Sequence, residues 1–189
     1  MVERIGLVGA AGAMGQSVSQ ALVARKKSFR VIGRSAAGLE ASFGRMPGAE
    51  RATWNPEDPD SVRAAFRGLD TLVYLVGVPY HRFDQHPVVM RQTLAGSVAE
   101  GVRRMVVVGT VYPYGVPRTT PLTEAHPRAP HTFKGRMRKA QEDLLLEADA
   151  AGKIRGTILR LPDFYGPGIE KSFLHDAFVA ALTGRTANL

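Results

Sequence analysis

The chain has 189 residues, no cysteine, 44% hydrophobic and 22% charged residues, and a formal charge of +8. This composition is typical of one soluble globular domain, and it excludes disulfides, thiolate metal sites and cysteine nucleophiles. We find no apolar run long enough to span a bilayer and no signal peptide, so we expect a cytoplasmic protein with no membrane partner.

The positive charge is spread over short groups such as residues 25–27, 103–104 and 134–139. Aromatic residues do not alternate with these groups as they would on a surface that stacks bases. We therefore interpret the charge as a solvated surface that partly attracts an anionic cofactor, and we expect no nucleic-acid partner.

The first predicted strand, residues 4–9, leads into a glycine-rich turn and then into a helix over residues 13–25. A glycine triplet alone is a weak signal, but strand, glycine turn and helix in this order indicate a dinucleotide-binding site. Glycine permits the tight turn, and its missing Cβ lets backbone N–H groups approach a pyrophosphate. The cofactor-binding residues predicted here are Gly9, Ala11, Gly12, Ala13, Met14 and Gly15.

The second predicted strand, residues 29–33, ends at Arg34. NAD-specific sites place an acidic residue about 20 positions after the glycines, where it binds the ribose hydroxyls. Here the first carboxylate is that of Glu40, whereas the Arg34 guanidinium can bind a 2′-phosphate through paired hydrogen bonds. We therefore favour NADP(H) over NAD(H), the alternative being an ordinary surface arginine at a strand end.

Strands and helices alternate over the rest of the chain. We expect further strands over residues 51–54, 69–76, 104–109 and 154–161, and further helices over residues 36–43, 58–67, 88–101, 132–151 and 172–183. This alternation predicts an α/β fold, a Rossmann-type doubly wound parallel sheet with strand order 3-2-1-4-5-6.

The ends of the third and fourth predicted strands supply more candidates for the cofactor site. Asn55 follows the third strand, where such folds often contact the adenine. Gly77, Val78 and Pro79 follow the fourth, where a small residue leaves room for the cofactor ribose. We expect all of them at the carboxyl edge of the sheet.

Two histidines, His81 and His86, fall in the predicted polar loop over residues 80–87. No third ligand lies at a suitable spacing, so we expect solvated histidines and no metal site.

Several short motifs then occur together: Gly9-x-x-Gly12-x-x-Gly15, Val107-Val108-Gly109-Thr110, Tyr114-Gly115, Pro121-Leu122-Thr123-Glu124 and Arg160-Leu161-Pro162-Asp163-Phe164-Tyr165-Gly166-Pro167-Gly168. With them the chain resembles, over essentially its whole length, the extended short-chain dehydrogenase/reductase superfamily, in its NAD-dependent epimerase/dehydratase group. In the last motif, Asp163 stands where the family has asparagine.

The resemblance implies an oxidoreductase or epimerase/dehydratase that acts on a carbonyl or hydroxyl group of a small molecule, with sugar nucleotides among the candidates. It implies that Thr110 donates a hydrogen bond to the substrate oxygen, where negative charge develops. It also implies that the backbone at Leu161, Pro162 and Asp163 lies near the nicotinamide.

The helix predicted over residues 132–151 departs from the family at its catalytic pair. The family has Tyr-x-x-x-Lys on one helical face, where the lysine lowers the pKa of the tyrosine that exchanges a proton. Counting back from Glu142, this chain has Lys134 and Arg138 at those two positions. The usual phenol is missing.

Several explanations stay open. Lys134 and Arg138 share a helical face and suit an anionic group, either a substrate carboxylate or the cofactor phosphates. One alternative is that Lys134 itself donates the proton, if neighbouring groups lower its pKa. Another is that Tyr112 or Tyr114 supplies the phenol. The alternative function is a non-catalytic NADP(H)-binding sensor or regulatory protein.

Members of the family normally continue into a smaller substrate domain. We expect a single NAD(P)-binding domain over residues 1–189 that is truncated before that domain. In the helix over 132–151, the predicted buried stripe is Phe133, Met137, Ala140, Leu144 and Ala148. Related proteins commonly pair through the two helices beside the fifth strand, so we expect a homodimer through residues 88–101 and 132–151, and Leu145 and Leu146 fit that use.

Overall fold

The computed structural model describes residues 3–166 and 172–186, apart from the side chain of Phe173. Its single sheet has six parallel strands in the order β3-β2-β1-β4-β5-β6. The strands are β1 (Ile5–Val8), β2 (Phe29–Gly33), β3 (Ala49–Thr53), β4 (Thr71–Tyr74), β5 (Arg104–Thr110) and β6 (Arg155–Leu161). The predicted fold class and strand order are confirmed.

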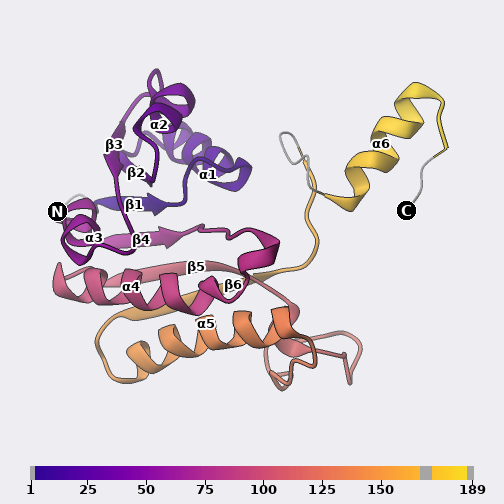
Figure 1. The fold of residues 1–189 in the computed structure, drawn as a ribbon. Coiled ribbons are helices and arrows are strands. Elements are labelled where there is room, and N and C mark those ends of the chain that lie inside the picture. Colours follow the sequence, from indigo (N-terminus) through magenta and orange to yellow (C-terminus); the bar gives the residue numbers. More distant parts are fainter. Residues whose placement is uncertain (1–2, 167–171, 187–189) are drawn as a thin grey trace.

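Six helices and two short 3₁₀ turns connect the described strands or follow them. They are α1 (Ala13–Ala24), α2 (Ala36–Phe43), α3 (Pro59–Phe66), η1 (Tyr80–Arg82), α4 (Gln85–Ala99), η2 (Tyr112–Tyr114), α5 (Phe133–Ala150) and α6 (Phe173–Thr183). Side chains cap several helices, because the Asp58 carboxylate accepts the Asp60 N–H and the Thr132 hydroxyl accepts the Gly135 N–H. Figure 1 shows α4 and α5 side by side and α6 standing apart from the sheet.

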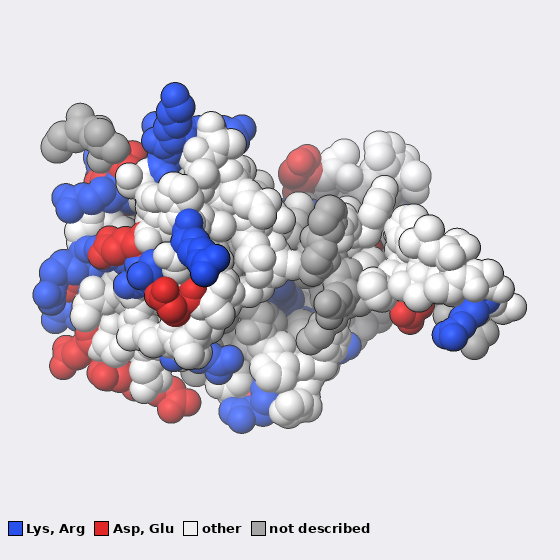
Figure 2. Space-filling model, turned by 90° about the horizontal axis from the view of Figure 1, so that it is seen from above, with Lys and Arg blue, Asp and Glu red and all other residues white. Residues whose placement is uncertain are grey.

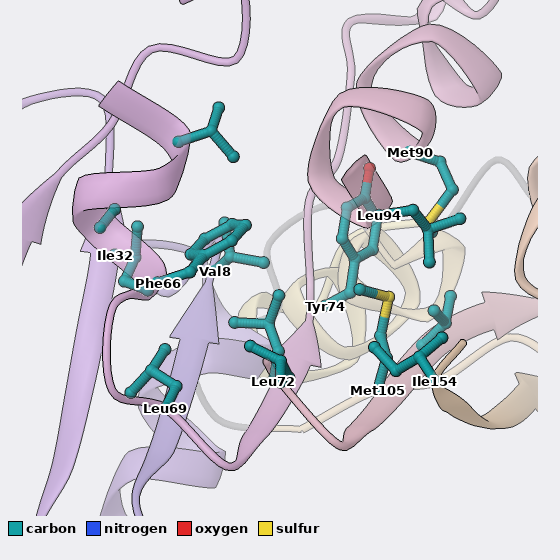
Figure 3. Packing of buried hydrophobic residues seen from close by; sticks show 14 of the residues in the cluster. Val8, Ile32, Phe66, Leu69, Leu72, Tyr74, Met90, Leu94, Met105 and Ile154 are labelled. Carbon is teal, nitrogen blue, oxygen red and sulfur yellow. The ribbon is translucent and has the colours of Figure 1, made fainter. Parts of the chain in front are cut away.

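The core has two layers, one on each side of the sheet. On one side, α3, α4 and α5 pack on the strands through buried residues such as Phe66, Leu94 and Leu145. In Figure 3 the Tyr74 ring lies between α4 and the sheet, close to Met90, Leu94 and Met105. On the other side, α1 and α2 cover β1 and β2. Both faces of the central strands are therefore buried, as a parallel sheet requires.

The buried face of α5 differs from the predicted stripe. Phe133 is 50% exposed, and Leu145, placed outside the stripe, is completely buried against the cluster that contains Phe66 and Tyr74. The polar residues Gln141 and Glu142 are also buried. Hydrophobic periodicity missed this face because Arg160 binds the Glu142 carboxylate and Arg138 binds the Gln141 Oε1 inside the protein, although the Gln141 Nε2 has no hydrogen-bond partner among the described residues.

Leu145 is therefore core and is not available to a partner chain. The homodimer through α4 and α5 stays a prediction, and it now depends on the exposed Val88 and Val98 of α4 and Leu146 of α5.

A buried polar cluster lies between β4, α4 and α5. It consists of Tyr74, His86, Arg138 and Gln141, and the Arg138 Nη1 donates to the Gln141 Oε1 over 2.7 Å and lies 3.4 Å from the His86 Nδ1. His86 belongs to α4, where only 1% of its surface is exposed, so the prediction of a solvated loop histidine is wrong for this residue. His81, in η1, is exposed as predicted. The sequence did contain a signal for this burial: His86 and Met90 are four residues apart, so both fall on one face of a helix.

Burial determines the charges in this cluster. Burial, helped by the nearby Arg138 cation, lowers the pKa of His86 to about 3. Burial also raises the pKa of the Tyr74 phenol and lowers the pKa of Arg138, although a guanidinium keeps its proton at any ordinary pH. At neutral pH the cluster therefore holds one positive charge.

Charged side chains of both signs are mixed over the body of the protein in the view of Figure 2, and α6 is largely uncharged. Among the described residues, no helix is both long and apolar enough to cross a membrane.

Leu145→Ala removes a completely buried side chain, so we expect the free energy of unfolding to fall by about 2–5 kcal/mol. The neighbouring Leu146→Ala truncates a side chain that is 37% exposed, and it is expected to cost less than about 1 kcal/mol. Urea unfolding of both variants measures the difference. Equal losses would contradict the burial assigned to α5.

His86→Leu tests the buried neutral histidine. In the unfolded chain histidine has a pKa of about 6.5, so below that pH the unfolded state binds one proton more than the folded state. The free energy of unfolding therefore falls by up to about 1.4 kcal/mol per pH unit as the pH drops from about 6.5 towards 3, and the variant should lose this part of the slope. Urea unfolding between pH 7 and pH 4 measures it, with the exposed His81→Leu as control. An unchanged slope in His86→Leu would contradict the assignment.

Candidate functional site

A cleft of about 890 Å³ opens at the carboxyl ends of β1, β2 and β4. Nine of the predicted cofactor-binding residues line it, namely Gly9, Ala11, Gly12, Ala13, Met14, Arg34, Gly77, Val78 and Pro79. The other lining residues, which were not predicted to bind the cofactor, are Gly33, Trp54, Pro56, Glu57, Leu75, Val76, His81, Arg82, Gln85, Val89 and Phe164. A second hollow, of about 790 Å³ between α1 and α2, contains none of the predicted site residues.

The three glycines of the turn have different physical roles. Gly9 has φ +82°, and a Cβ there would lie 2.8 Å from the backbone of Leu75 and Val76. A Cβ on Gly15 would collide with the backbone of Ala10. Gly9 and Gly15 are therefore needed for the packing of β1 and α1 on their neighbours, and Gly15 lies in α1 outside the cleft lining.

Gly12 and Gly77 are different, because a Cβ on either would meet nothing within 4 Å. Gly12 is also the N-cap of α1 and makes no side-chain cap, so the first backbone N–H groups of the helix stay available to an anion. Because neither glycine has a Cβ, the space beside it in the cleft stays free, and a ligand can approach the protein backbone there. These features fit a dinucleotide with its pyrophosphate at the start of α1.

At the other end of the cleft, Arg34 follows β2 and is exposed. It makes no ion pair with any described residue. Asn55 is not among the residues that line the cleft, and its contact with the cofactor stays a prediction. Its side-chain oxygen accepts the Glu57 N–H over 3.1 Å in a local turn, and Trp54, Pro56 and Glu57 border the cleft in its place.

The predicted catalytic residues lie outside the cleft lining, next to its η1 border. The ammonium of Lys134 lies 4.1 Å from the centre of the Tyr80 ring and 5.9 Å from that of Phe83. Tyr80 directly follows Pro79, which lines the cleft. Tyr80 was not among the predicted site residues, and nothing in the local sequence marks its contact with α5.

Thr110 and Tyr112 come from the end of β5 and the turn after it. The Thr110 hydroxyl accepts the Tyr112 N–H over 3.3 Å. Burial raises the pKa of Tyr112, and the neighbouring Tyr80 and Asp163 raise it further. The structure therefore brings together Thr110, Tyr112, Tyr80 and Asp163, with Tyr112 protonated at neutral pH. Leu161 and Pro162 lie beside this group, at the end of β6, and do not line the cleft.

Tyr114, the other candidate phenol, is occupied. It is 4% exposed, and its hydroxyl accepts a hydrogen bond from Arg160 Nη1 over 3.0 Å. Arg160 in turn donates through Nε and Nη2 to the Glu142 carboxylate, which raises the pKa of Arg160. Tyr114 is therefore buried and bound to Arg160, whereas Tyr112 is 39% exposed. Among the described residues no group of three side chains could hold a metal ion.

The chain matches the NAD dependent epimerase/dehydratase family over residues 5–188. It is 28% identical over 198 residues to a dTDP-6-deoxy-L-talose 4-dehydrogenase (NAD(P)(+)) of Kitasatospora kifunensis, covering 98% of this chain and 62% of that protein. It is 32% identical over 179 residues to an uncharacterised protein of Sinorhizobium fredii, covering 85% and 50%. The chain thus spans between half and two thirds of the length of these relatives.

Solved structures show the same fold. A dTDP-glucose 4,6-dehydratase of Streptomyces venezuelae, with NAD bound, has a TM-score of 0.84 at 20% identity, covering 98% of this chain and 64% of that one. A UDP-galactose 4-epimerase has a TM-score of 0.80 at 20% identity, covering 97% and 64%. The glycine turn, the strand order and the match over residues 5–188 lead to one conclusion: the chain belongs to the NAD-dependent epimerase/dehydratase family of the extended short-chain dehydrogenase/reductase superfamily.

Proposed function

We propose that the protein is a cytoplasmic NADP(H)-dependent oxidoreductase or epimerase/dehydratase that acts on a carbonyl or hydroxyl group of a small molecule. The observation that carries the proposal is the cleft itself. Gly12 and Gly77 leave open space in the cleft, and Arg34 lies at one end of it. At its border, Tyr80 of η1 lies beside Lys134.

In this proposal the start of α1 binds the pyrophosphate and Arg34 binds the 2′-phosphate. Trp54 and Pro56 flank the adenine, and the backbone at Leu161, Pro162 and Asp163 lies towards the nicotinamide. The bound cofactor supplies or accepts a hydride. Glu57 is the one feature that disfavours a 2′-phosphate, because it brings a carboxylate to the same cleft.

Thr110 donates a hydrogen bond to the substrate oxygen in the proposed reaction. Tyr112 gives that oxygen a proton as negative charge develops on it. Burial raises the pKa of this phenol and makes it a weaker acid, so the transfer relies on the strong basicity of the developing alkoxide. The positive charge of Lys134, held against the Tyr80 ring, stabilises negative charge at the same place. These residues replace the missing tyrosine of α5.

Arg34→Met should weaken NADPH binding by about tenfold or more and leave NADH binding unchanged, because only NADPH carries the 2′-phosphate. Glu57→Gln, the matched change at the same end of the cleft, should not reduce NADPH affinity. Energy transfer from Trp54, the single tryptophan, to the bound reduced cofactor measures both affinities. A wild-type protein that binds NADH more tightly than NADPH would overturn the cofactor preference.

Tyr112→Phe should reduce NADPH oxidation with a panel of carbonyl compounds and nucleotide sugars by about 100-fold or more, and Thr110→Val should reduce it as well. Tyr165→Phe, a change of an exposed tyrosine, is the control. Undiminished turnover in Tyr112→Phe would exclude that residue as the proton donor. Tight NADPH binding with no turnover on any compound would favour the alternative function, a non-catalytic NADP(H)-binding sensor. The missing tyrosine of α5 is the observation that supports this alternative.

A further inference from the structure

The basic residues around α5 differ in whether a carboxylate accompanies them. Lys139 pairs with Asp143 over 2.7 Å, Arg128 with Asp143 over 2.8 Å, and Arg160 with Glu142 over 2.9 Å. Lys134 and Arg138 form no ion pair with any described residue. Lys134 and Arg138 thus lie one turn apart with no carboxylate within ion-pair distance among the described residues. The exposed Arg136 also has no ion pair, but Lys134 and Arg138 differ from it because both are partly buried.

Lys134 is half-buried, and its ammonium rests against the faces of Tyr80 and Phe83. An aromatic face attracts the cation and fixes its position. It does not replace a hydrogen-bond acceptor, so the N–H donors of Lys134 are left for another group.

Arg138 is held more rigidly. Its Nη1 donates to Gln141, and its Nε is buried with no hydrogen-bond partner among the residues described. The neighbouring His86 is neutral, as its low pKa shows, and supplies no negative charge. The carboxylate of Glu142 acts on the Arg138 charge from beyond ion-pair distance. The Arg138 Nη2 makes no hydrogen bond to any described residue, so its N–H groups can donate to an oxygen of a carboxylate.

We propose that Lys134 and Arg138 bind a carboxylate of the substrate. The proposal rests on the proposed function, in which the reacting oxygen lies at Thr110 and Tyr112. Residues at i and i+4 lie about 6 Å apart on one helical face, so a single carboxylate can contact both. Arg138 is also close enough to Tyr112 and Tyr80 for each to influence its charge. The substrate is therefore an anionic oxo or hydroxy compound whose carboxylate lies near the reacting carbon.

The cofactor phosphates are a different source of negative charge. Their proposed sites, at the start of α1 and at Arg34, belong to the cleft lining, and neither Lys134 nor Arg138 does. The carboxylate site and the phosphate sites should therefore respond to different substitutions.

Malonate, a small dicarboxylate, is the probe, and neutral malonamide is its matched control. At constant ionic strength and saturating NADPH, malonate should raise the melting temperature with a saturable dependence on concentration, and malonamide should not. Lys134→Met and Arg138→Met should each weaken malonate binding by about tenfold or more. Arg136→Met, at an exposed cation of the same helix that donates to the His131 carbonyl, should leave it unchanged.

The proposal is overturned if malonate shows no saturable effect, or if folded Lys134→Met binds malonate as the wild type does. It is also overturned if Lys134→Met weakens NADPH and leaves malonate unaffected, because the cation then serves the cofactor phosphates. Lys134→Met carries the test if Arg138→Met fails to fold, since Lys134 is only half-buried. Trp54 energy transfer separates failure of the carboxylate site from failure of the proposed function. If the wild-type protein does not bind NADPH, the proposed function fails, and the melting temperature with malonate alone still tests the carboxylate site.

Discussion

The buried carboxylate of Glu142 fixes α5 to the carboxyl end of the sheet, and the position of the candidate site depends on it. It is 2% exposed and accepts hydrogen bonds from Arg160 on β6 and Arg128 in the segment before α5. A buried ion pair is strongly destabilising when one partner is lost, so this contact sets where the first turns of α5 lie.

A second constraint acts at the opposite side of the site. Gly9 and Gly15 allow β1 and α1 to approach their neighbours more closely than any other residue would permit. This close packing places the N-terminus of α1 at the cleft, where Gly12 leaves space for a ligand. The cofactor cleft and the first turn of α5 are therefore positioned by independent contacts, and η1 is the element that joins them.

The cations around α5 fall into two groups, those that have a carboxylate partner and those that do not. Cations that hold α5 in place, such as Arg160 and Lys139, have carboxylate partners. Lys134 and Arg138 rest instead on aromatic rings and on neutral polar groups. The substrate carboxylate proposed above would give both cations an ion-pair partner.

The sequence by itself determined the alternation of strands and helices and the glycine turn, because these depend on local hydrophobic patterns and on backbone freedom. The sheet order followed from the doubly wound fold that this alternation indicates. It also led to the family through motifs spread along the chain. The tertiary structure alone decided which face of α5 is buried, that His86 is core and neutral, and that Tyr80 meets Lys134. The physical reason is that burial of a polar side chain depends on contacts with distant segments, as for Glu142 with Arg128 and Arg160, and the local sequence does not contain those contacts.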